Sequence, residues 1–173
     1  MSSPSQVWAV ITGAGGSGSI GAAILRRLVQ REPNLHVLGV GRRLPQLEEA
    51  KQLAISAPGV EKGEERLHIL KADITTSDGL YKVVAAIPSN ACVKYLIHSA
   101  AILQPIGPLT EIDRSTWHKF YATNVDAPLF LTQALIPSLK RCVADNGTKA
   151  RVLHVGSVSA HQPTVGWVSF VTY

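Results

Sequence analysis

Short apolar segments alternate along this chain with longer segments in which apolar residues recur at helical spacing. Five of the short segments are rich in β-branched residues, which is typical of strands that are buried on both faces of a parallel sheet. The predicted strands comprise residues 7–11, 35–40, 67–71, 93–98 and 152–155. Strands of this kind require helices on both faces of the sheet.

The segments between the predicted strands carry the signals of helices. Ile20, Ile24 and Leu28 recur at helical spacing, and Pro33 closes this first helix before the next strand. Further helices are predicted over residues 44–56, 77–87 and 115–142. Pro128 lies inside the last of these, where it removes one backbone hydrogen bond, so we predict a kink between residues 124 and 128.

This alternation of strand and helix predicts the fold class. Parallel strands joined by right-handed helical crossovers give a doubly wound α/β sheet of the Rossmann type. Such a sheet binds its ligand beyond the carboxyl ends of the strands, at the switch point between the first and the fourth strand in sequence. We therefore expect the ligand-binding residues to follow the predicted strands.

Composition favours one globular domain over residues 1–173. The chain is 46% hydrophobic and 17% charged, and no apolar run approaches the roughly 18 residues of a membrane span. The first residues lack the pattern of a signal peptide, which favours a cytoplasmic location. The net charge of +5 is spread along the chain, so a small anionic ligand is favoured over nucleic acid. Cys92 and Cys142 are predicted to be free thiols, and neither stands in a metal-ligand spacing.

The glycine-rich segment after the first strand is the clearest candidate site. Residues 7–21 read VWAVITGAGGSGSIG, which is a strand, a glycine loop and the start of a helix in that order. Such a loop lets a diphosphate approach the backbone, and the helix N-terminus offers N–H groups and the positive end of its dipole. The residues predicted to bind a nucleotide cofactor here are Gly13, Ser17, Gly18, Ser19 and Ile20.

Two arginines follow the second strand, where a dinucleotide fold contacts the adenosine ribose. NAD-binding sites tend to place a carboxylate there, but this chain has Gly41, followed by Arg42 and Arg43. Cations at this place favour the 2′-phosphate of NADP (NADPH), although the same arginines could simply open a solvated helix. After the third strand, Asp73 suits the adenine amino group with Ile74 against the ring, or alternatively Asp73 caps the next helix.

Several short motifs follow one another along the chain: TGAGGSGSIG at 12–21, GRR at 41–43, AD at 72–73, HSAA at 98–101, ATNVDAP at 122–128 and HVGS at 154–157. In order and spacing they resemble the short-chain dehydrogenase/reductase family from residue 7 to about residue 167, with HSAA in place of the family's NNAG. QPTVGW at 162–167 is also similar to the sepiapterin and benzil reductase branch. The resemblance implies NADPH-dependent reduction of a small carbonyl substrate, such as a ketone, a diketone or a pteridine-like compound.

The resemblance also implies roles for individual residues. Ser157 would hydrogen-bond the substrate oxygen. Asn124 would hold, through the backbone of its kinked helix, the water that resupplies protons. The residues placed near the nicotinamide are the small ones Ser99, Ala100 and Ala101.

The chain departs from the family pattern at three places. Ser17 and Ser19 stand where the common loop has glycines, and His98 replaces the first residue of NNAG, where we expect it to be a packed residue. The family's proton-donating tyrosine falls on Phe170 by its usual spacing from the serine, or on Tyr173 if the spacing is longer. The family's lysine would then fall at position 174 or 177, after the last residue of this sequence.

These departures leave two functions open. The first is the carbonyl reductase, for which we expect a fold truncated after the fifth strand, without the family's next helix, its sixth and seventh strands and its substrate lid. A complete domain of this family is expected to form homo-oligomers. The second is a catalytically silent nucleotide-binding or interaction module that keeps the cofactor site. In either case the strand at 152–155 is predicted to be an unpaired and exposed edge of the sheet.

Overall fold

Five parallel strands and the helices between them make up the part of the chain that the computed structural model describes, residues 6–158, 161, 162 and 166. The strands are β1 (Val7–Thr12), β2 (Leu35–Gly41), β3 (Leu67–Lys71), β4 (Cys92–His98) and β5 (Arg151–His154). The helices are α1 (Ile20–Arg31), α2 (Leu44–Ile55), α3 (Gly63–Arg66), α4 (Ser77–Ala85), α5 (Arg114–Tyr121) and α6 (Ala127–Asn146), with a 3-10 turn η1 (Leu109–Glu111) and a π-helical turn η2 (Ala122–Asp126). All five predicted strands are confirmed.

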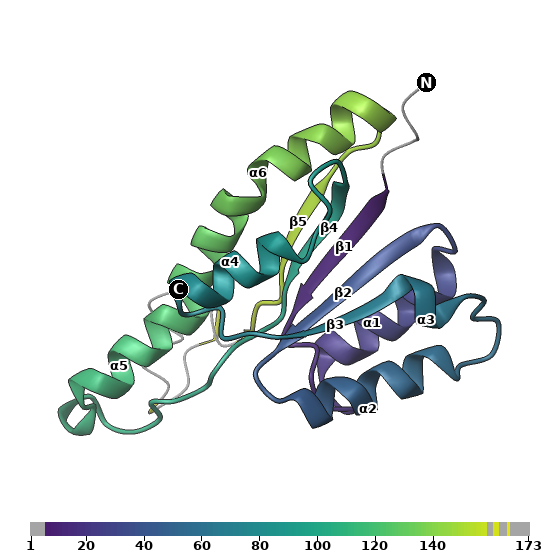
Figure 1. The fold of residues 1–173 in the computed structure, drawn as a ribbon. Helices are drawn as coiled ribbons and strands as arrows, with labels where there is room; N and C mark the ends of the chain where they lie inside the picture. Colours follow the sequence, from purple (N-terminus) through teal and green to yellow (C-terminus); the bar gives the residue numbers. More distant parts are fainter. Residues whose placement is uncertain (1–5, 159–160, 163–165, 167–173) are drawn as a thin grey trace.

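The sheet is wound in two directions from its central strand. β1 pairs in parallel with β2, where Val7 lies beside Leu35, and with β4, where Thr12 lies beside His98. The strand order is β3-β2-β1-β4-β5 (Figure 1). The switch point therefore lies between β1 and β4, and the predicted doubly wound sheet of the Rossmann type is confirmed.

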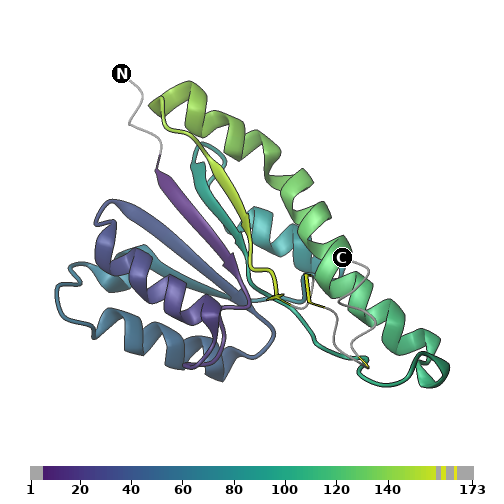
Figure 2. The same cartoon turned by 180° about the vertical axis from the view of Figure 1, so that it is seen from behind.

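Helices cover both faces of the sheet (Figures 1 and 2). Along β1, Trp8 and Val10 belong to the core under α4 and α6, whereas Ala9 and Ile11 belong to the core under α1 and α2. All four side chains are buried. Burial on both faces explains why the strand sequences are continuously apolar rather than alternating.

The helix predicted over residues 115–142 is interrupted where Pro128 enters it. α5 ends at Tyr121, and in η2 the N–H of Ala127 donates to the carbonyl of Ala122, five residues back. Proline has no N–H for the regular ladder, and the wider π turn accommodates it in the first turn of α6. The predicted irregularity is confirmed and takes the form of a π turn. α6 then continues through Pro137, and no helix of the described residues has the length and apolarity to span a membrane.

α3 and η1 are short elements that the hydrophobic pattern does not predict. α3 ends at Arg66, whose side chain is buried with 7% exposure. Its guanidinium donates to the carbonyl oxygens of Val29, Glu32, Leu35 and Glu61 at 2.9–3.3 Å. Backbone carbonyls at the end of α1 and the start of β2 thus compensate the buried charge. The hydrogen bonds of Arg66 therefore link α3 to the end of α1 and the start of β2.

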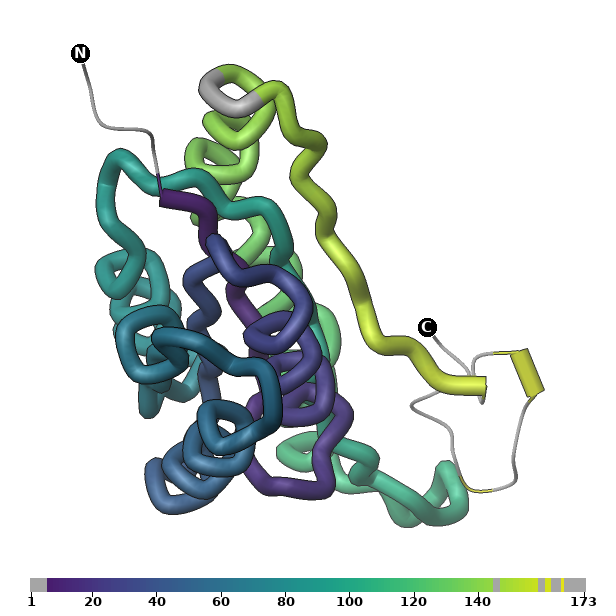
Figure 3. The backbone as a smooth tube through the Cα atoms, turned by 90° about the vertical axis from the view of Figure 1, so that its right-hand side faces the viewer, coloured from purple at the N-terminus to yellow at the C-terminus, as the bar shows by residue number. Residues whose placement is uncertain are grey.

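β5 forms the exposed edge of the sheet. All four of its residues are exposed, and Val152 and Leu153 are 39% and 43% exposed. Figure 3 shows β5 running along the outside of the fold. The predicted exposed edge is confirmed for the residues that the structure describes.

Cys92 of β4 and Cys142 of α6 are both buried free thiols, as predicted. Burial, and after it a hydrogen bond with the Cys92 sulfur, raises the pKa of the Cys142 thiol to about 12. Since the thiolate is the reactive form, Cys142 is an unreactive core residue near neutral pH.

Candidate functional site

A cleft of about 280 Å³ lies at the carboxyl ends of β1 to β4. The glycine loop, the residues after β2 and β3, and the segment after β4 line it. The predicted cofactor-binding residues that it brings together are Gly13, Ser19, Arg42, Arg43, Asp73, Ile74, Ser99, Ala100 and Ala101. This convergence lies at the switch point, where a doubly wound sheet binds its ligand.

Three other residues predicted in the glycine loop lie outside the lining of the cleft. Ser17 and Gly18 are exposed, and the Ile20 side chain is 59% exposed at the first position of α1. The residues of this loop that face the cleft are Gly13 and Ser19, together with Gly15, which the sequence analysis does not single out.

Gly13 brings the loop against the segment after β4. Its backbone has φ +71°, and a Cβ atom there would lie 2.6 Å from the nitrogen and 2.7 Å from the Cα of Ala100. Glycine is the residue that adopts this conformation at no steric cost, and only a residue without a Cβ fits this contact. Gly13 and Ala100, which both line the cleft, therefore lie in backbone contact.

Thr12 is a positioning residue that the sequence analysis does not single out. It is buried at the end of β1, and its hydroxyl accepts hydrogen bonds from the N–H groups of Ser99 and Ala100, both at 3.2 Å. These bonds hold the end of β4 against the glycine loop. One sequence signal points to this role: Thr12 is the polar residue that ends an otherwise apolar strand, directly before Gly13.

The end of the cleft next to β2 and β3 carries charges of both signs. Arg42 and Arg43 are exposed on its wall. The Asp73 carboxylate accepts hydrogen bonds from the N–H and the hydroxyl of Thr75, at 3.0 and 2.7 Å. Burial raises the pKa of Asp73, but the Thr75 hydrogen bonds and the Arg42 charge together outweigh it and lower the pKa. Thr76 caps α4, so the alternative interpretation of Asp73 as the helix cap is wrong.

Asn124 lies buried on the π turn η2, next to Thr123, which lines the cleft. Its Oδ1 accepts from the N–H of Ile102 and its Nδ2 donates to the carbonyl of Ile102, both at 2.9 Å. The side chain thus fixes the segment after β4 against the helix. Asn124 therefore lies next to the cleft but is not part of its lining.

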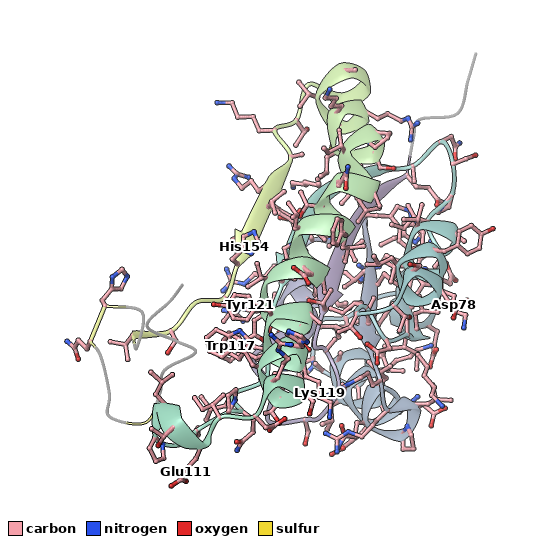
Figure 4. The ribbon with its side chains drawn as sticks, turned by 90° about the vertical axis from the view of Figure 1, so that its left-hand side faces the viewer. Asp78, Glu111, Trp117, Lys119, Tyr121 and His154 are labelled. Atoms are coloured by element: carbon pink, nitrogen blue, oxygen red, sulfur yellow. The ribbon has the colours of Figure 1, made fainter. Side chains whose placement is uncertain are left out.

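The remaining candidate residues follow β5. Ser157 lies three residues after its end and is half-buried, outside the lining of the cleft. Figure 4 shows His154 on the same edge of the molecule as Trp117 and Tyr121, whose ring centroids are 4.8 Å apart. The two candidates for the proton donor, Phe170 and Tyr173, lie outside the described residues.

This combination of fold and cleft matches a known family. The family model described as short chain dehydrogenase matches residues 7–172, which includes all five strands. The chain belongs to the short-chain dehydrogenase family. The resemblance inferred from the motifs is confirmed at the level of the family.

Relatives of this chain include proteins named as a reductase and a dehydrogenase. The chain is 32% identical over 127 residues to a sulfoacetaldehyde reductase of Chromohalobacter salexigens, which covers 73% of this chain and 46% of the relative. It is 30% identical over 158 residues to a serine 3-dehydrogenase of Agrobacterium fabrum, which covers 91% of this chain and 56% of the relative. It spans about half the length of these two relatives.

Solved structures share the fold. The crystal structure of a metagenomic short-chain oxidoreductase in complex with NADP matches 97% of this chain and 71% of that chain, with a TM-score of 0.76 and 23% sequence identity. At this identity the likeness concerns the fold.

Ser19, which stands in place of a glycine of the short-chain dehydrogenase loop, has a structural explanation. It is the N-cap of α1, and its hydroxyl accepts from the N–H of Ala22 at 3.1 Å. The same hydroxyl donates to the carbonyl of Gly13 at 3.4 Å. Serine is a favoured N-cap residue, so this departure strengthens the start of α1 while the backbone still faces the cleft.

His98, which replaces an asparagine of the short-chain dehydrogenase pattern, is a packed residue, as predicted. It is buried at the end of β4, its Nε2 lies 2.9 Å from the hydroxyl of Thr132, and its ring stacks on His154 of β5 at 4.7 Å between centroids. Burial, and then the neighbouring charge of His154, lowers the pKa of His98 to about 4. The imidazole is therefore neutral at physiological pH.

The low pKa of His98 predicts that the protein is destabilised by mild acid. Between pH 6.5 and about 4 the unfolded chain binds a proton that native His98 does not, so stability is full above pH 6.5 and falls by up to about 3 kcal/mol toward pH 4. His36 and His68, whose pKa values are lowered mainly by burial, act in the same direction. Urea unfolding at a series of pH values between 7.5 and 4.5 measures the slope of the free energy of unfolding against pH.

The variant His98→Asn identifies the source of this slope. It should flatten the pH dependence of the free energy of unfolding, because the asparagine side chain does not titrate in this range. An undiminished slope in His98→Asn would show that other groups cause it.

Proposed function

We propose that the protein binds NADPH in this cleft and reduces a small carbonyl compound by hydride transfer. The observation that carries the proposal is the pair Arg42 and Arg43 after β2, on the wall of the cleft. Gly41 leaves no carboxylate at this place to hold a ribose 2′-hydroxyl. Two guanidinium groups suit the 2′-phosphate, which offers charged oxygens for paired hydrogen bonds.

Other residues of the cleft fit the remaining parts of the cofactor. Asp73 suits the adenine amino group, because its lowered pKa keeps the carboxylate an acceptor. Ile74 is buried beside it and offers an apolar surface to the ring. The backbone at Gly13 and the N-terminus of α1 suit the diphosphate. The small residues 99–101 leave room for the nicotinamide.

The proposed chemistry follows the family. Bound NADPH would supply the hydride. Ser157 is proposed to hydrogen-bond the substrate oxygen, and Tyr173 to donate the proton. Asn124 is proposed to position the water that resupplies this proton through the backbone of η2, since its side chain is engaged with Ile102. If Phe170 occupies the tyrosine position instead, the expected result is cofactor binding without turnover.

The relatives support an oxidoreductase of this kind. The two curated relatives are named as a reductase and a dehydrogenase, and one structural neighbour contains NADP. The motif at 162–167 supports the finer assignment to the sepiapterin and benzil reductase branch, with a ketone, a diketone or a pteridine-like compound as substrate. Since the chain spans about half the length of the curated relatives, turnover by the whole protein, its homo-oligomeric assembly and its cytoplasmic location belong to the same proposal.

The cofactor assignment is tested with the double variant Arg42→Ala/Arg43→Ala. Each charge-assisted hydrogen bond contributes about 1.5–3 kcal/mol and less at an exposed site, so NADPH binding should weaken roughly 10- to 100-fold. NADH carries no 2′-phosphate, and its dissociation constant should change by less than about threefold. Fluorescence titration with each cofactor measures both constants.

A matched control removes two arginines elsewhere. Arg26 and Arg27 are both exposed on α1, and replacing both by alanine should leave the NADPH affinity unchanged. Equal weakening of NADPH and NADH binding in the Arg42/Arg43 variant would overturn the assignment. The reductase activity itself is tested by the loss of NADPH absorbance at 340 nm with a panel of diketones. Tight NADPH binding without turnover would favour the silent module.

A further inference from the structure

Lys71 lies beside the arginines that the proposed function assigns to the cofactor. It is the last residue of β3, and in the sheet its Cα is paired with that of Gly41, which directly precedes Arg42 and Arg43. Residues paired across parallel strands point to the same face of the sheet. A Cβ atom on Gly41 would lie 3.2 Å from the Leu47 side chain of α2, so the Lys71 side chain also points to the face that α2 covers.

A second hollow, adjoining the main cleft, connects Lys71 with the start of α2. Its lining consists of Arg42, Arg43, Leu44, Pro45, Gln46 and Lys71. Arg42, Arg43 and Gln46 also line the main cleft, so the two hollows share one wall. A group that extends from the adenosine ribose past the arginines would therefore come within reach of Lys71.

The three cations around this hollow are not neutralised by ion pairs. The ion pairs found among the described residues involve other lysines, and Lys71, Arg42 and Arg43 have no carboxylate within 4.0 Å there. All three side chains are exposed. The start of α2 adds to the positive potential, because in the described structure no side chain caps its first turn at Arg43. The hollow thus collects positive charge from β3, from the β2–α2 loop and from a helix N-terminus.

We propose that Lys71 is a third cation of the 2′-phosphate site and determines, together with Arg42 and Arg43, the preference for NADP(H) over NAD(H). The inference rests on the proposed function for the identity of the ligand. The arginines provide planar groups that can each bind two phosphate oxygens, whereas Lys71 provides a mobile point charge from the neighbouring strand. The side chain acts on the adenosine end of the cofactor and takes no part in hydride transfer.

Fragments of the cofactor test this inference without catalysis. Isothermal titration of the protein with 2′,5′-ADP and with 5′-AMP measures what the 2′-phosphate contributes to binding. In Lys71→Met the dissociation constant for 2′,5′-ADP should rise roughly 3- to 10-fold, and that for 5′-AMP should stay within twofold. The dependence of 2′,5′-ADP affinity on salt concentration should become less steep, since one cation has been removed.

Two further variants separate charge from structure. Lys71→Arg keeps the charge and should retain most of the preference for 2′,5′-ADP. Lys140→Met removes another exposed lysine, on α6 across the sheet, and should bind both fragments like the unaltered protein. Because Lys71 is exposed, the unfolding midpoint of Lys71→Met should match that of the unaltered protein.

The outcomes distinguish the inference from the function on which it rests. If the unaltered protein binds the two fragments equally, the assignment of NADPH fails and the inference with it. If it prefers 2′,5′-ADP, and if Arg42→Ala/Arg43→Ala loses this preference while Lys71→Met keeps it, the cofactor assignment stands and the role of Lys71 is overturned. A selective loss in Lys71→Met that Lys71→Arg restores establishes the role.

Discussion

Gly13→Ala should weaken cofactor binding beyond detection and lower the free energy of unfolding by about 2–5 kcal/mol. A side chain at φ +71° costs about 1–2 kcal/mol by itself. The new Cβ would also lie 2.6 Å from the backbone nitrogen of Ala100, which Thr12 holds in place through its hydroxyl. The loop and the segment after β4 must therefore separate, which distorts the diphosphate site. Urea unfolding and NADPH titration measure the two effects.

Gly16 and Gly18 provide matched controls within the same loop. Gly16 also has a positive φ, +91°, but a Cβ there meets nothing within 4 Å, so Gly16→Ala should show only the conformational cost of about 1–2 kcal/mol. Gly18 has neither a positive φ nor a close neighbour, and Gly18→Ala should be nearly neutral. If Gly13→Ala destabilises the protein no more than Gly16→Ala does, the close contact with Ala100 is not what requires glycine.

Arg66→Met should strongly destabilise the protein although Arg66 lies away from the cleft. The substitution keeps an apolar stem but removes the donors to four backbone carbonyls. The hydrogen bonds to Val29 and Leu35 are buried, and the other three are partly buried. Unsatisfied buried groups cost about 1–3 kcal/mol each, and partial relaxation should bring the total loss to about 3–5 kcal/mol. Urea unfolding followed by circular dichroism measures this loss.

Two substitutions test whether the donors of Arg66 are responsible. Arg66→Lys keeps the charge with fewer and less spread donors, so it should restore only part of the lost stability. Arg26→Met, on the exposed side of α1, should change the free energy of unfolding by less than about 0.5 kcal/mol. A loss below about 1 kcal/mol in Arg66→Met would falsify the role assigned to the buried guanidinium.

The strands were predictable because strands buried on both faces are continuously apolar, and such runs can be recognised in a few neighbouring residues. The segment at 35–40 is continuously apolar apart from His36, and the structure places it as β2 between β1 and β3. The order of the strands then follows from handedness and from the switch point, so the residues that follow the strands could be predicted to meet. Arg42, Asp73 and Ser99 come from different strand ends and do line one cleft.

Residues whose partners are backbone groups were not predictable in the same way. Thr12 accepts hydrogen bonds from amides 87 and 88 residues later in the chain, and any sequence there would offer these amides. Arg66 likewise binds backbone carbonyls, which every residue carries. Its helix, α3, has only four residues, which is too short for apolar residues to recur at helical spacing. Tertiary arrangement alone decides such contacts.

The glycine loop shows a limit of a different kind. Its motif predicts that a phosphate-binding backbone is present, but not which residues face the ligand. Ser19 takes the N-cap position, so Ile20 becomes the first helical residue and its side chain points to solvent. The exact start of a helix depends on capping geometry, which the sequence motif leaves open by a residue or two.

The two hydrogen bonds between Asn124 and Ile102 reproduce on a side chain what two peptide groups do across neighbouring strands. A carboxamide has the same donor and acceptor as a peptide group. The Asn124 side chain therefore extends the hydrogen-bonded pairing of the chain beyond the end of β4. Aspartate has the same shape but cannot donate, and leucine can do neither. The carboxamide of Asn124 therefore sets the distance between η2 and the segment at Ile102 that lines the cleft.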